Sequence, residues 1–196
     1  MKSVINKKAN QILFKQENIL YQQKLLLEKL NFLQPISIYQ LGKVASQSVW
    51  KTLLENGFKS VFHFHFYETI DEAKKKNANF KVNNDSLDAD ILKKNELLKN
   101  CKIITLVREP ISRNISDFFQ NFEYFTSQKL SEVKFNNKQL SHLFMNSYDF
   151  DYVLNWFDFE FKLKTGIDAY KQNFDKKKGY SIYNINDYEL MIMKTE

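Results

Sequence analysis

The stretch that decides the fold runs from Ile36 to Leu53 and reads ISIYQLGKVASQSVWKTL. Its first four residues form a short apolar run behind a proline, which predicts a buried strand. From Ser46 onward the pattern is that of a helix that begins with serine. Gly42 and Lys43 lie in the turn between them. Such a strand, turn and helix start can bind phosphate, because unpaired N–H groups and the positive end of the helix dipole face the anion.

This loop is not a Walker A motif. That motif has a glycine five residues before its Gly-Lys pair, and a Ser or Thr directly after the lysine to hold Mg²⁺. Here Ser37 and Val44 occupy those two positions. The sequence therefore predicts a site for a phosphate-like group without a metal. The alternative is an ordinary strand-to-helix turn with a surface lysine.

The composition is that of one folded domain. The chain has 196 residues, of which 43% are hydrophobic and 15% aromatic, which excludes a disordered protein. The net charge of +6 suits an anionic cofactor or an acidic substrate. This excess is too small and too scattered to indicate nucleic acid, so we expect no nucleic-acid partner.

The single cysteine, Cys101, excludes an intramolecular disulfide and a cysteine-based zinc site. It precedes an apolar run, so we expect a buried thiol. Every apolar stretch is short and interrupted by charge, which excludes a signal peptide or a transmembrane segment. We expect a cytoplasmic protein.

Residues 1–34 form a separate N-terminal helical segment in this prediction, and residues 35–196 form the α/β domain. Ile12, Ile19, Leu26 and Leu33 recur every seven residues, a spacing typical of a helix. We expect this helix to dock onto the domain or onto a second subunit, which would make a homodimer. A coiled coil is the alternative.

Residues 60–67 alternate, with phenylalanines on one predicted face and Val61, His63 and His65 on the other. A strand, a helix and a second strand within some thirty residues form a βαβ unit, so the sheet is expected to be parallel. Residues 71–100 are polar and rich in lysine. They predict surface helix and loop, with a turn at residues 83–85.

A continuous apolar strand at residues 103–107 runs into Arg108, and Pro110 suits the first turn of the helix that follows. Arg113 and Ser116 are three residues apart and share a face of that helix. Two arginines and a serine at the carboxyl end of a strand predict a second anion site. We expect both anion sites to open toward one crevice above the sheet.

The last third of the domain is predicted to be mostly helical from residue 128 to 165, where Gly166 ends the helix. Residues 180–183 and 190–193 predict a closing hairpin or a final pair of strands. The chain stops after an apparent core strand, so we expect it to be truncated at the C-terminus.

Two motifs carry a resemblance to a known family. Residues 42–50, GKVASQSVW, resemble the 5′-phosphosulfate loop of sulfotransferases, especially of the carbohydrate-modifying branch. Residues 108–119 resemble their 3′-phosphate motif, with Arg, Pro, Arg and Ser in this spacing before an aromatic pair. The stretch VREPISRNISDFFQNF looks most like bacterial capsular polysaccharide synthesis proteins. The cytosolic branch has proline where Gly42 stands, so the loop here is expected to be more mobile.

This resemblance implies a three-layer, P-loop-NTPase-like sulfotransferase fold with a central parallel sheet. It implies 3′-phosphoadenosine 5′-phosphosulfate (PAPS) as cofactor, no metal, and a glycan hydroxyl as acceptor, in capsular or surface polysaccharide synthesis. Lys43 would contact the 5′ side and also act in catalysis, and Arg108 and Ser116, supported by Arg113, would hold the 3′-phosphate. The implied cofactor-binding residues are Gly42, Lys43, Val44, Ala45, Ser46, Gln47, Ser48, Arg108, Arg113 and Ser116.

Sulfuryl transfer also needs a base for the acceptor hydroxyl. His65 is the best-placed candidate, near the carboxyl end of its strand, and His63 lies one pleat deeper. Glu68, just past the strand, is the alternative catalytic residue. Both histidines could instead be structural, and His142 is expected at the surface.

Two other functions compete with sulfuryl transfer. A nucleotide or sugar kinase on the same fold would need a Mg²⁺-binding hydroxyl after Lys43, which Val44 does not supply. A non-catalytic polysaccharide-assembly protein would not need the intact set of Lys43, Arg108, Arg113 and Ser116.

Overall fold

The computed structural model describes residues 34–186 and 188–195. The helix predicted within residues 1–34, and the dimer contact assigned to it, lie outside the described residues. Among the described residues, no helix combines the length and the apolar character needed to cross a bilayer.

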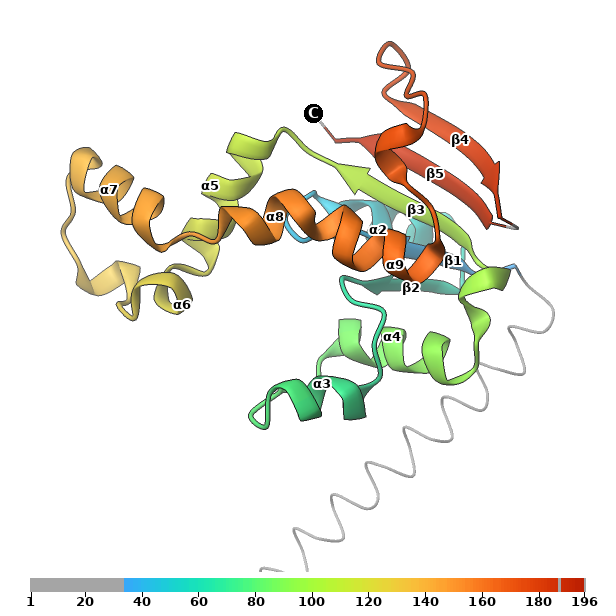
Figure 1. Cartoon of the computed structure of the whole chain (residues 1–196), viewed down its shortest axis with the longest axis horizontal. Coiled ribbons are helices and arrows are strands. Elements are labelled where there is room, and N and C mark those ends of the chain that lie inside the picture. Colours follow the sequence, from blue (N-terminus) through green and yellow to red (C-terminus); the bar gives the residue numbers. More distant parts are fainter. Residues whose placement is uncertain (1–33, 187, 196) are drawn as a thin grey trace, which may run out of the picture.

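The core of the fold is a mixed five-stranded sheet with the order β2-β1-β3-β5-β4 (Figure 1). All neighbouring strands pair in parallel except β4, which runs antiparallel to β5. The first three predicted strands are therefore adjacent, as expected, and the last two form the predicted hairpin. The expected parallel sheet is wrong only at its β4 edge. The strands are β1 (Ile36–Tyr39), β2 (Val61–Phe64), β3 (Lys102–Val107), β4 (Tyr180–Ile185) and β5 (Tyr188–Lys194).

The second strand is shorter than predicted. β2 ends at Phe64, and His65 lies in a bend instead of the strand. β2 is at the edge of the sheet and pairs only with β1, whose last residue, Tyr39, is opposite Phe64. Beyond that pair the chain has no ladder partner, so the strand stops there.

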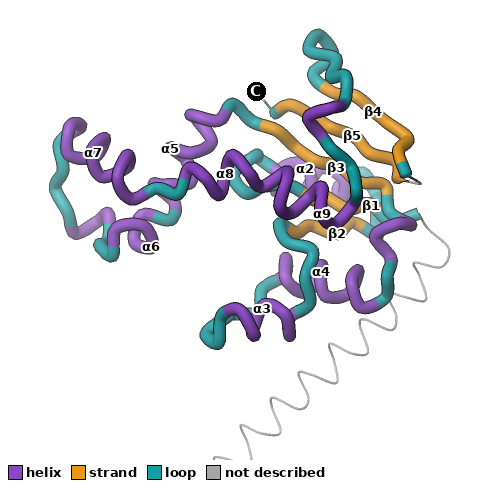
Figure 2. Tube along the Cα trace, in the orientation of Figure 1, coloured by secondary structure: helices purple, strands orange, loops and turns teal. Residues whose placement is uncertain are grey.

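Helices flank the sheet (Figure 2). The predicted helix starts at Ser46 and Pro110 are confirmed, and Gly166, with φ of 73°, ends the helical region as expected. The α-helices are α2 (Ser46–Glu55), α3 (Ile70–Lys76), α4 (Asn84–Lys94), α5 (Pro110–Gln120), α6 (Phe122–Thr126), α7 (Asn137–Ser147), α8 (Phe150–Trp156) and α9 (Leu163–Thr165). The other helical turns are the 3₁₀ segments η1 (Leu97–Asn100), η2 (Leu130–Glu132) and η4 (Ala169–Lys171), and the π-helical segment η3 (Phe157–Lys162).

Both faces of the sheet carry apolar side chains. The larger cluster joins Tyr39, Phe64 and Leu92 to Trp156, all fully buried, under α4 and α8. The smaller cluster is centred on Ile38, with α2 packed against it. Alternate residues of β1 thus belong to opposite clusters, which is why this strand is buried along its whole length.

The region from residue 71 to 100 is not only surface. α4 packs beside β2 and buries Ala89, Ile91 and Leu92. The predicted turn at residues 83–85 is wrong, because Asn83 caps α4 and accepts a hydrogen bond from the amide of Ser86. Cys101, by contrast, is buried as predicted, and burial raises the pKa of its thiol to about 11.

A buried carboxylate fastens the ends of β1 and β2 to the helical layer. Glu160, in the π-helical segment, accepts hydrogen bonds from the Tyr39 hydroxyl at 2.6 Å and from the Tyr67 amide at 2.7 Å. Burial, together with the nearby Glu160 carboxylate, raises the pKa of the Tyr39 hydroxyl. Single π-helical turns often mark functional sites, and this one contacts the last residue of β1 and the segment that follows β2.

Candidate functional site

The loop between β1 and α2 is held in a strained conformation. Lys43 and Ala45 have φ of 69° and 60°, in the left-handed region, which costs a non-glycine residue about 1–2 kcal/mol. The glycine of this loop, Gly42, is not among the positive-φ residues. The freedom expected at Gly42 is therefore not what shapes the loop. Strain of this kind recurs at ligand sites, where the surrounding structure holds it in place.

α2 begins without a side-chain cap. Its N-cap is Ala45, whose side chain accepts no hydrogen bond, and Ser46 is its first helical residue. The first amides of the helix have no carbonyl partner within it, and they lie at the positive end of its dipole. An anion placed at this loop would accept the hydrogen bonds from these amides that a capping side chain normally accepts.

The second motif meets the first at the same edge of the sheet. Arg108 follows β3, and β3 is the direct neighbour of β1. Its Nη1 donates a hydrogen bond to the carbonyl oxygen of Lys43 at 3.3 Å. The expectation that the two motifs open toward one edge is therefore confirmed. Lys43 donates from Nζ to the Gln120 side chain, so its ammonium lies toward α5.

Arg113 holds the loop in place. It is 4% exposed, and its Nε donates to the carbonyl oxygen of Gly42 at 2.9 Å. Its Nη1 donates to the Tyr148 hydroxyl and lies 3.3 Å from an Asp117 carboxylate oxygen. With these partners Arg113 holds the loop between β1 and α2 against α5 and Tyr148. Ser116 lies half-buried on the same helix.

Three side chains far apart in sequence form a hydrogen-bonded series. The hydroxyl of Ser46 lies 2.8 Å from Nε2 of His63, and Nδ1 of His63 lies 3.1 Å from a carboxylate oxygen of Asp85. Because the carboxylate can only accept, Nδ1 donates and Nε2 accepts the serine proton. The Ser46 hydroxyl is thus engaged with His63, which leaves its amide for an anion.

His65 lies at the rim of this series, with 30% of its side chain exposed. Its Nδ1 is 2.9 Å from the Gln40 carbonyl oxygen and its Nε2 is 3.3 Å from a carboxylate oxygen of Asp85, and because both partners only accept, a neutral ring donates to one of them at a time. Burial lowers the pKa of His65, against the opposing effects of Gln40 and Asp85. The ring is therefore neutral at pH 7, and when its proton is on Nδ1, Nε2 can take up a second proton that the Asp85 carboxylate would stabilise.

Gln40, which was not among the predicted site residues, lies between the two rings. It is fully buried directly after β1, and its Nε2 lies 3.1 Å from Nε2 of His63 and 3.3 Å from Nδ1 of His65. Asp85 was missed as well. Gln40 could have been found from the sequence, because it is a polar residue at the carboxyl end of a buried strand. Nothing in the sequence around Asp85 indicates that it contacts the histidines.

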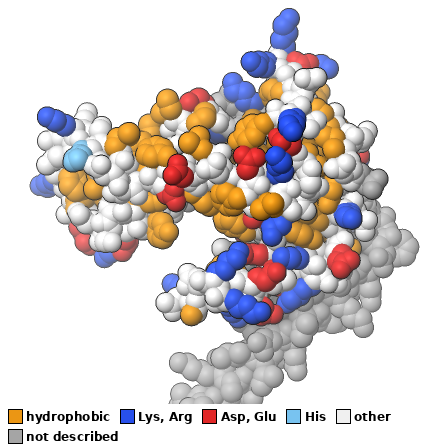
Figure 3. Space-filling view, in the orientation of Figure 1, with side chains coloured by type: hydrophobic (Ala, Val, Ile, Leu, Met, Phe, Trp, Pro, Cys, Tyr) orange, Lys and Arg blue, Asp and Glu red, His pale blue; other side chains and the backbone are white. Residues whose placement is uncertain are grey.

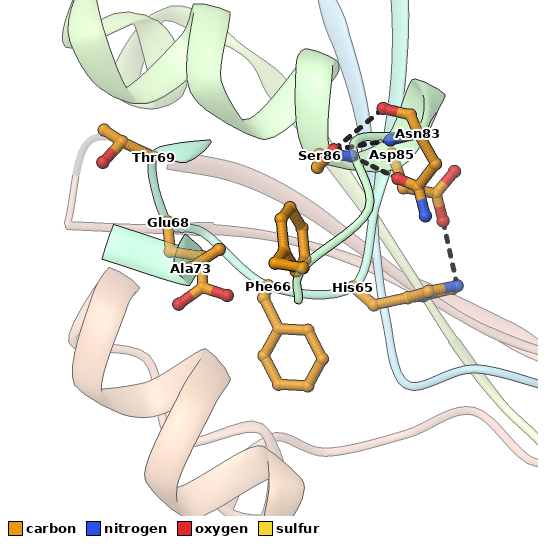
Figure 4. Close-up of a pocket in the computed structure, with 9 residues that line it drawn as sticks. His65, Phe66, Glu68, Thr69, Ala73, Asn83, Asp85 and Ser86 are labelled. Carbon is orange, nitrogen blue, oxygen red and sulfur yellow. Dashed lines mark hydrogen bonds and ion pairs between the residues drawn. The ribbon is translucent and has the colours of Figure 1, made fainter. Parts of the chain in front are cut away.

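A pocket of about 230 Å³ adjoins His65 (Figure 4). Both predicted bases line it, and Figure 4 shows Phe66 between His65 and Glu68. Glu68 is paired with Lys76 at 2.5 Å, whereas His65 contacts Asp85. The remaining lining residues are Thr69, Ala73, Phe80, Asn83, Asp85 and Ser86. His142 lies far from these groups in sequence and is exposed on α7, as predicted.

Within residues 34–186 and 188–195, His, Cys, Asp and Glu side chains nowhere form a group of three that could hold a metal ion.

Two aspartates on α4 should respond oppositely to pH. Burial raises the pKa of Asp88 to about 6, so its contribution to stability is present near pH 4 and is lost as the pH rises through 6. Asp88→Asn keeps an acceptor for the His63 amide, at 2.8 Å in the parent. We expect this variant to be more stable than the parent by about 1–3 kcal/mol at pH 8, with the gain shrinking toward pH 4. Urea denaturation across this range measures it.

Asp85→Asn is the matched control on the same helix. Burial alone would raise the pKa of Asp85, but the hydrogen bond from His63 and the two nearby imidazoles lower it overall. The contribution of Asp85 to stability is therefore present at neutral pH and is lost as the pH falls through its lowered pKa. Asp85→Asn should destabilise the protein at pH 8, and equal responses of the two variants would contradict this assignment.

Comparison with known proteins returned nothing similar to this chain: no protein-family model, no curated protein and no solved structure matches it.

Proposed function

We propose that this protein is a PAPS-dependent sulfotransferase that moves a sulfuryl group to a glycan hydroxyl, in capsular or surface polysaccharide synthesis in the cytoplasm. Its sheet would then be the central layer of a P-loop-NTPase-like sulfotransferase fold. One observation carries the proposal: two anion-binding motifs follow neighbouring parallel strands, and Arg108 of one donates to the Lys43 carbonyl of the other. The resemblance of both motifs to the phosphate motifs of sulfotransferases supports it.

The residues around the loop fit the cofactor. The uncapped start of α2, the strained backbone of Lys43 and Ala45, and two basic side chains suit a ligand with separated phosphates. Residues 42–48 would hold the 5′-phosphosulfate, and Arg108 with Ser116 would hold the 3′-phosphate. The bound cofactor supplies the sulfuryl group and a bisphosphate leaving group. The chain's own contribution is preorganised positive charge at that leaving group.

His65 is the proposed base. In the tautomer with its proton on Nδ1, which donates to the Gln40 carbonyl oxygen, Nε2 of His65 takes the proton of the attacking acceptor hydroxyl, and the Asp85 carboxylate 3.3 Å from Nε2 stabilises the imidazolium that forms. The Ser46–His63–Asp85 series behind it holds the local geometry. Glu68 lines the same pocket, but its pairing with Lys76 makes it the second choice.

A thermal-shift screen with the full chain tests the function. We expect 3′-phosphoadenosine 5′-phosphate, the product of the cofactor, to raise the melting temperature more than ATP, with no added effect of Mg²⁺. A larger shift with ATP and Mg²⁺ would support a kinase instead. No shift with any of these nucleotides would support a non-catalytic role in polysaccharide assembly.

Arg108→Ala should mainly weaken cofactor binding. Loss of a charged hydrogen bond to the 3′-phosphate costs about 1.5–3 kcal/mol, or about 10- to 150-fold in Kd. Titration calorimetry with 3′-phosphoadenosine 5′-phosphate measures it.

The control for this variant is Arg113→Ala. Arg113 is buried against Gly42, Tyr148 and Asp117, so its loss should lower the melting temperature of the free protein by more than Arg108→Ala does. An unchanged Kd in Arg108→Ala would remove the 3′-phosphate assignment.

A further inference from the structure

A second pocket, of about 420 Å³, lies between the α5–α6 region and the start of α8. Its lining combines two kinds of group. The rings of Tyr124, Phe125 and Tyr152 supply flat apolar surface, and the side chains of Asp117, Asn121 and Asp149 supply hydrogen-bonding oxygens and an amide. No lysine, arginine or histidine is among its lining residues.

This combination matches the chemistry of a sugar ring. A hexose presents a face of C–H groups, which packs on an aromatic ring, and hydroxyls at its edge, which donate to carboxylates. Tyr124 is 84% exposed, so most of its ring surface is open to a ligand. Its ring makes an edge-to-face contact with that of Phe125, with the ring centroids 5.2 Å apart.

The second pocket lies beside the first, with one lining residue in common. Phe66, the residue after His65, lines both pockets. Figure 3 shows the molecule hollowed between the arm that carries α5 to α8 and the part that carries α3. A linear molecule with one hydroxyl at His65 would therefore pass Phe66 and reach Tyr152, whose ring centroid is 6.3 Å from that of Phe66.

We propose that the second pocket is a subsite for a neighbouring sugar unit, and that the acceptor is a glycan chain of at least two units. The unit bound there is neutral or carries an amino group. An acidic or sulfated sugar would meet the Asp149 carboxylate with no cation among the lining residues, although the second carboxylate, Asp117, is paired with Arg113 behind the pocket wall. The assignment of the first pocket to the acceptor hydroxyl rests on the proposed function, whereas the sugar chemistry of the second pocket does not.

The test is a printed array of oligosaccharides probed with the full chain. The array holds neutral, N-acetylated and uronic acid-containing chains of one to six units. We expect retention on neutral or amino-sugar chains of two or more units, and a loss of about three- to tenfold in apparent affinity for Tyr124→Ala, the effect of one aromatic contact. Because Tyr124 is exposed, this variant should fold like the parent.

Tyr170→Ala is the matched control. Tyr170 is also exposed, at 65%, and its ring makes a similar edge contact with Phe157, at 5.6 Å, outside both pockets. It should leave retention unchanged. No retention on any chain, retention on acidic chains alone, or equal retention by Tyr124→Ala and the parent would each overturn the subsite.

The array is read without the cofactor, so its outcome is separate from that of the nucleotide screen. If retention depends on Tyr124 but 3′-phosphoadenosine 5′-phosphate does not shift the melting temperature, the sugar site is supported and the sulfotransferase function is contradicted. If the nucleotide shifts the melting temperature but no sugar chain is retained, the donor site is supported and the sugar subsite is contradicted.

Discussion

Lys43→Met is expected to abolish measurable sulfuryl transfer while the fold and most of the affinity for 3′-phosphoadenosine 5′-phosphate remain. The lysine acts on charge that grows on the leaving group, and removal of one such donor lowers the turnover rate by about 10²–10³. Methionine keeps an unbranched stem at a position with φ of 69°, so the loop backbone is not further strained. Release of 3′-phosphoadenosine 5′-phosphate, followed by chromatography, measures the rate.

Lys51→Met is the control for charge alone. Lys51 lies on α2, 73% exposed, with only a distant pairing to Glu55 at 3.8 Å. It removes the same charge eight residues from Lys43 and should leave turnover near that of the parent. If both variants lost activity equally, the loss would be due to the lower net positive charge of the protein and not to a missing contact between Lys43 and the leaving group.

The second large effect is expected at His65. His65→Ala should lower turnover by about 10²–10⁴, the contribution of a general base, with cofactor affinity and melting temperature close to those of the parent. Burial lowers the pKa of His65, and only the neutral ring can take a proton. The rate of the parent protein should therefore be constant at neutral pH and fall only below about pH 6.5.

His63→Ala separates the two histidines. His63 is buried between Ser46 and Asp85, so its removal leaves buried polar groups without partners and should lower the free energy of unfolding by about 1–3 kcal/mol. An exchange of the two phenotypes would transfer the catalytic role to His63. If neither variant slowed transfer and Glu68→Gln did, the base would be the carboxylate.

Local sequence was enough to predict the strands, the loop and the helix starts around the candidate site. Some signals depend only on residues close by in the sequence. They are the apolar runs at residues 36–39 and 103–107, which predict strands, the glycine-containing loop, which predicts a turn, and Pro110, which predicts a helix start. Their consequence, two basic motifs at neighbouring strand ends, followed from the handedness and adjacency of parallel strands.

Local sequence misjudged features that depend on a partner. Strand β2 stops at Phe64 because β1 stops at Tyr39, which no pattern in residues 60–67 reveals. The positive φ angles of the loop after β1 are likewise at Lys43 and Ala45 and not at Gly42, whose carbonyl oxygen accepts from Arg113, 71 residues further along the chain.

What the sequence by itself determined is the order of the polar groups along the strands: a Gly-Lys loop after the first strand, histidines in and directly after the second, and an arginine motif after the third. Only the tertiary structure decided which groups surround the histidines. Asp85 reaches His63 because α4 buries its apolar face beside β2, and Gln40 lies between the two rings because β1 and β2 end together. Hydrophobic burial has no direction of its own, so the side chains it brings together are set by the packing of whole elements.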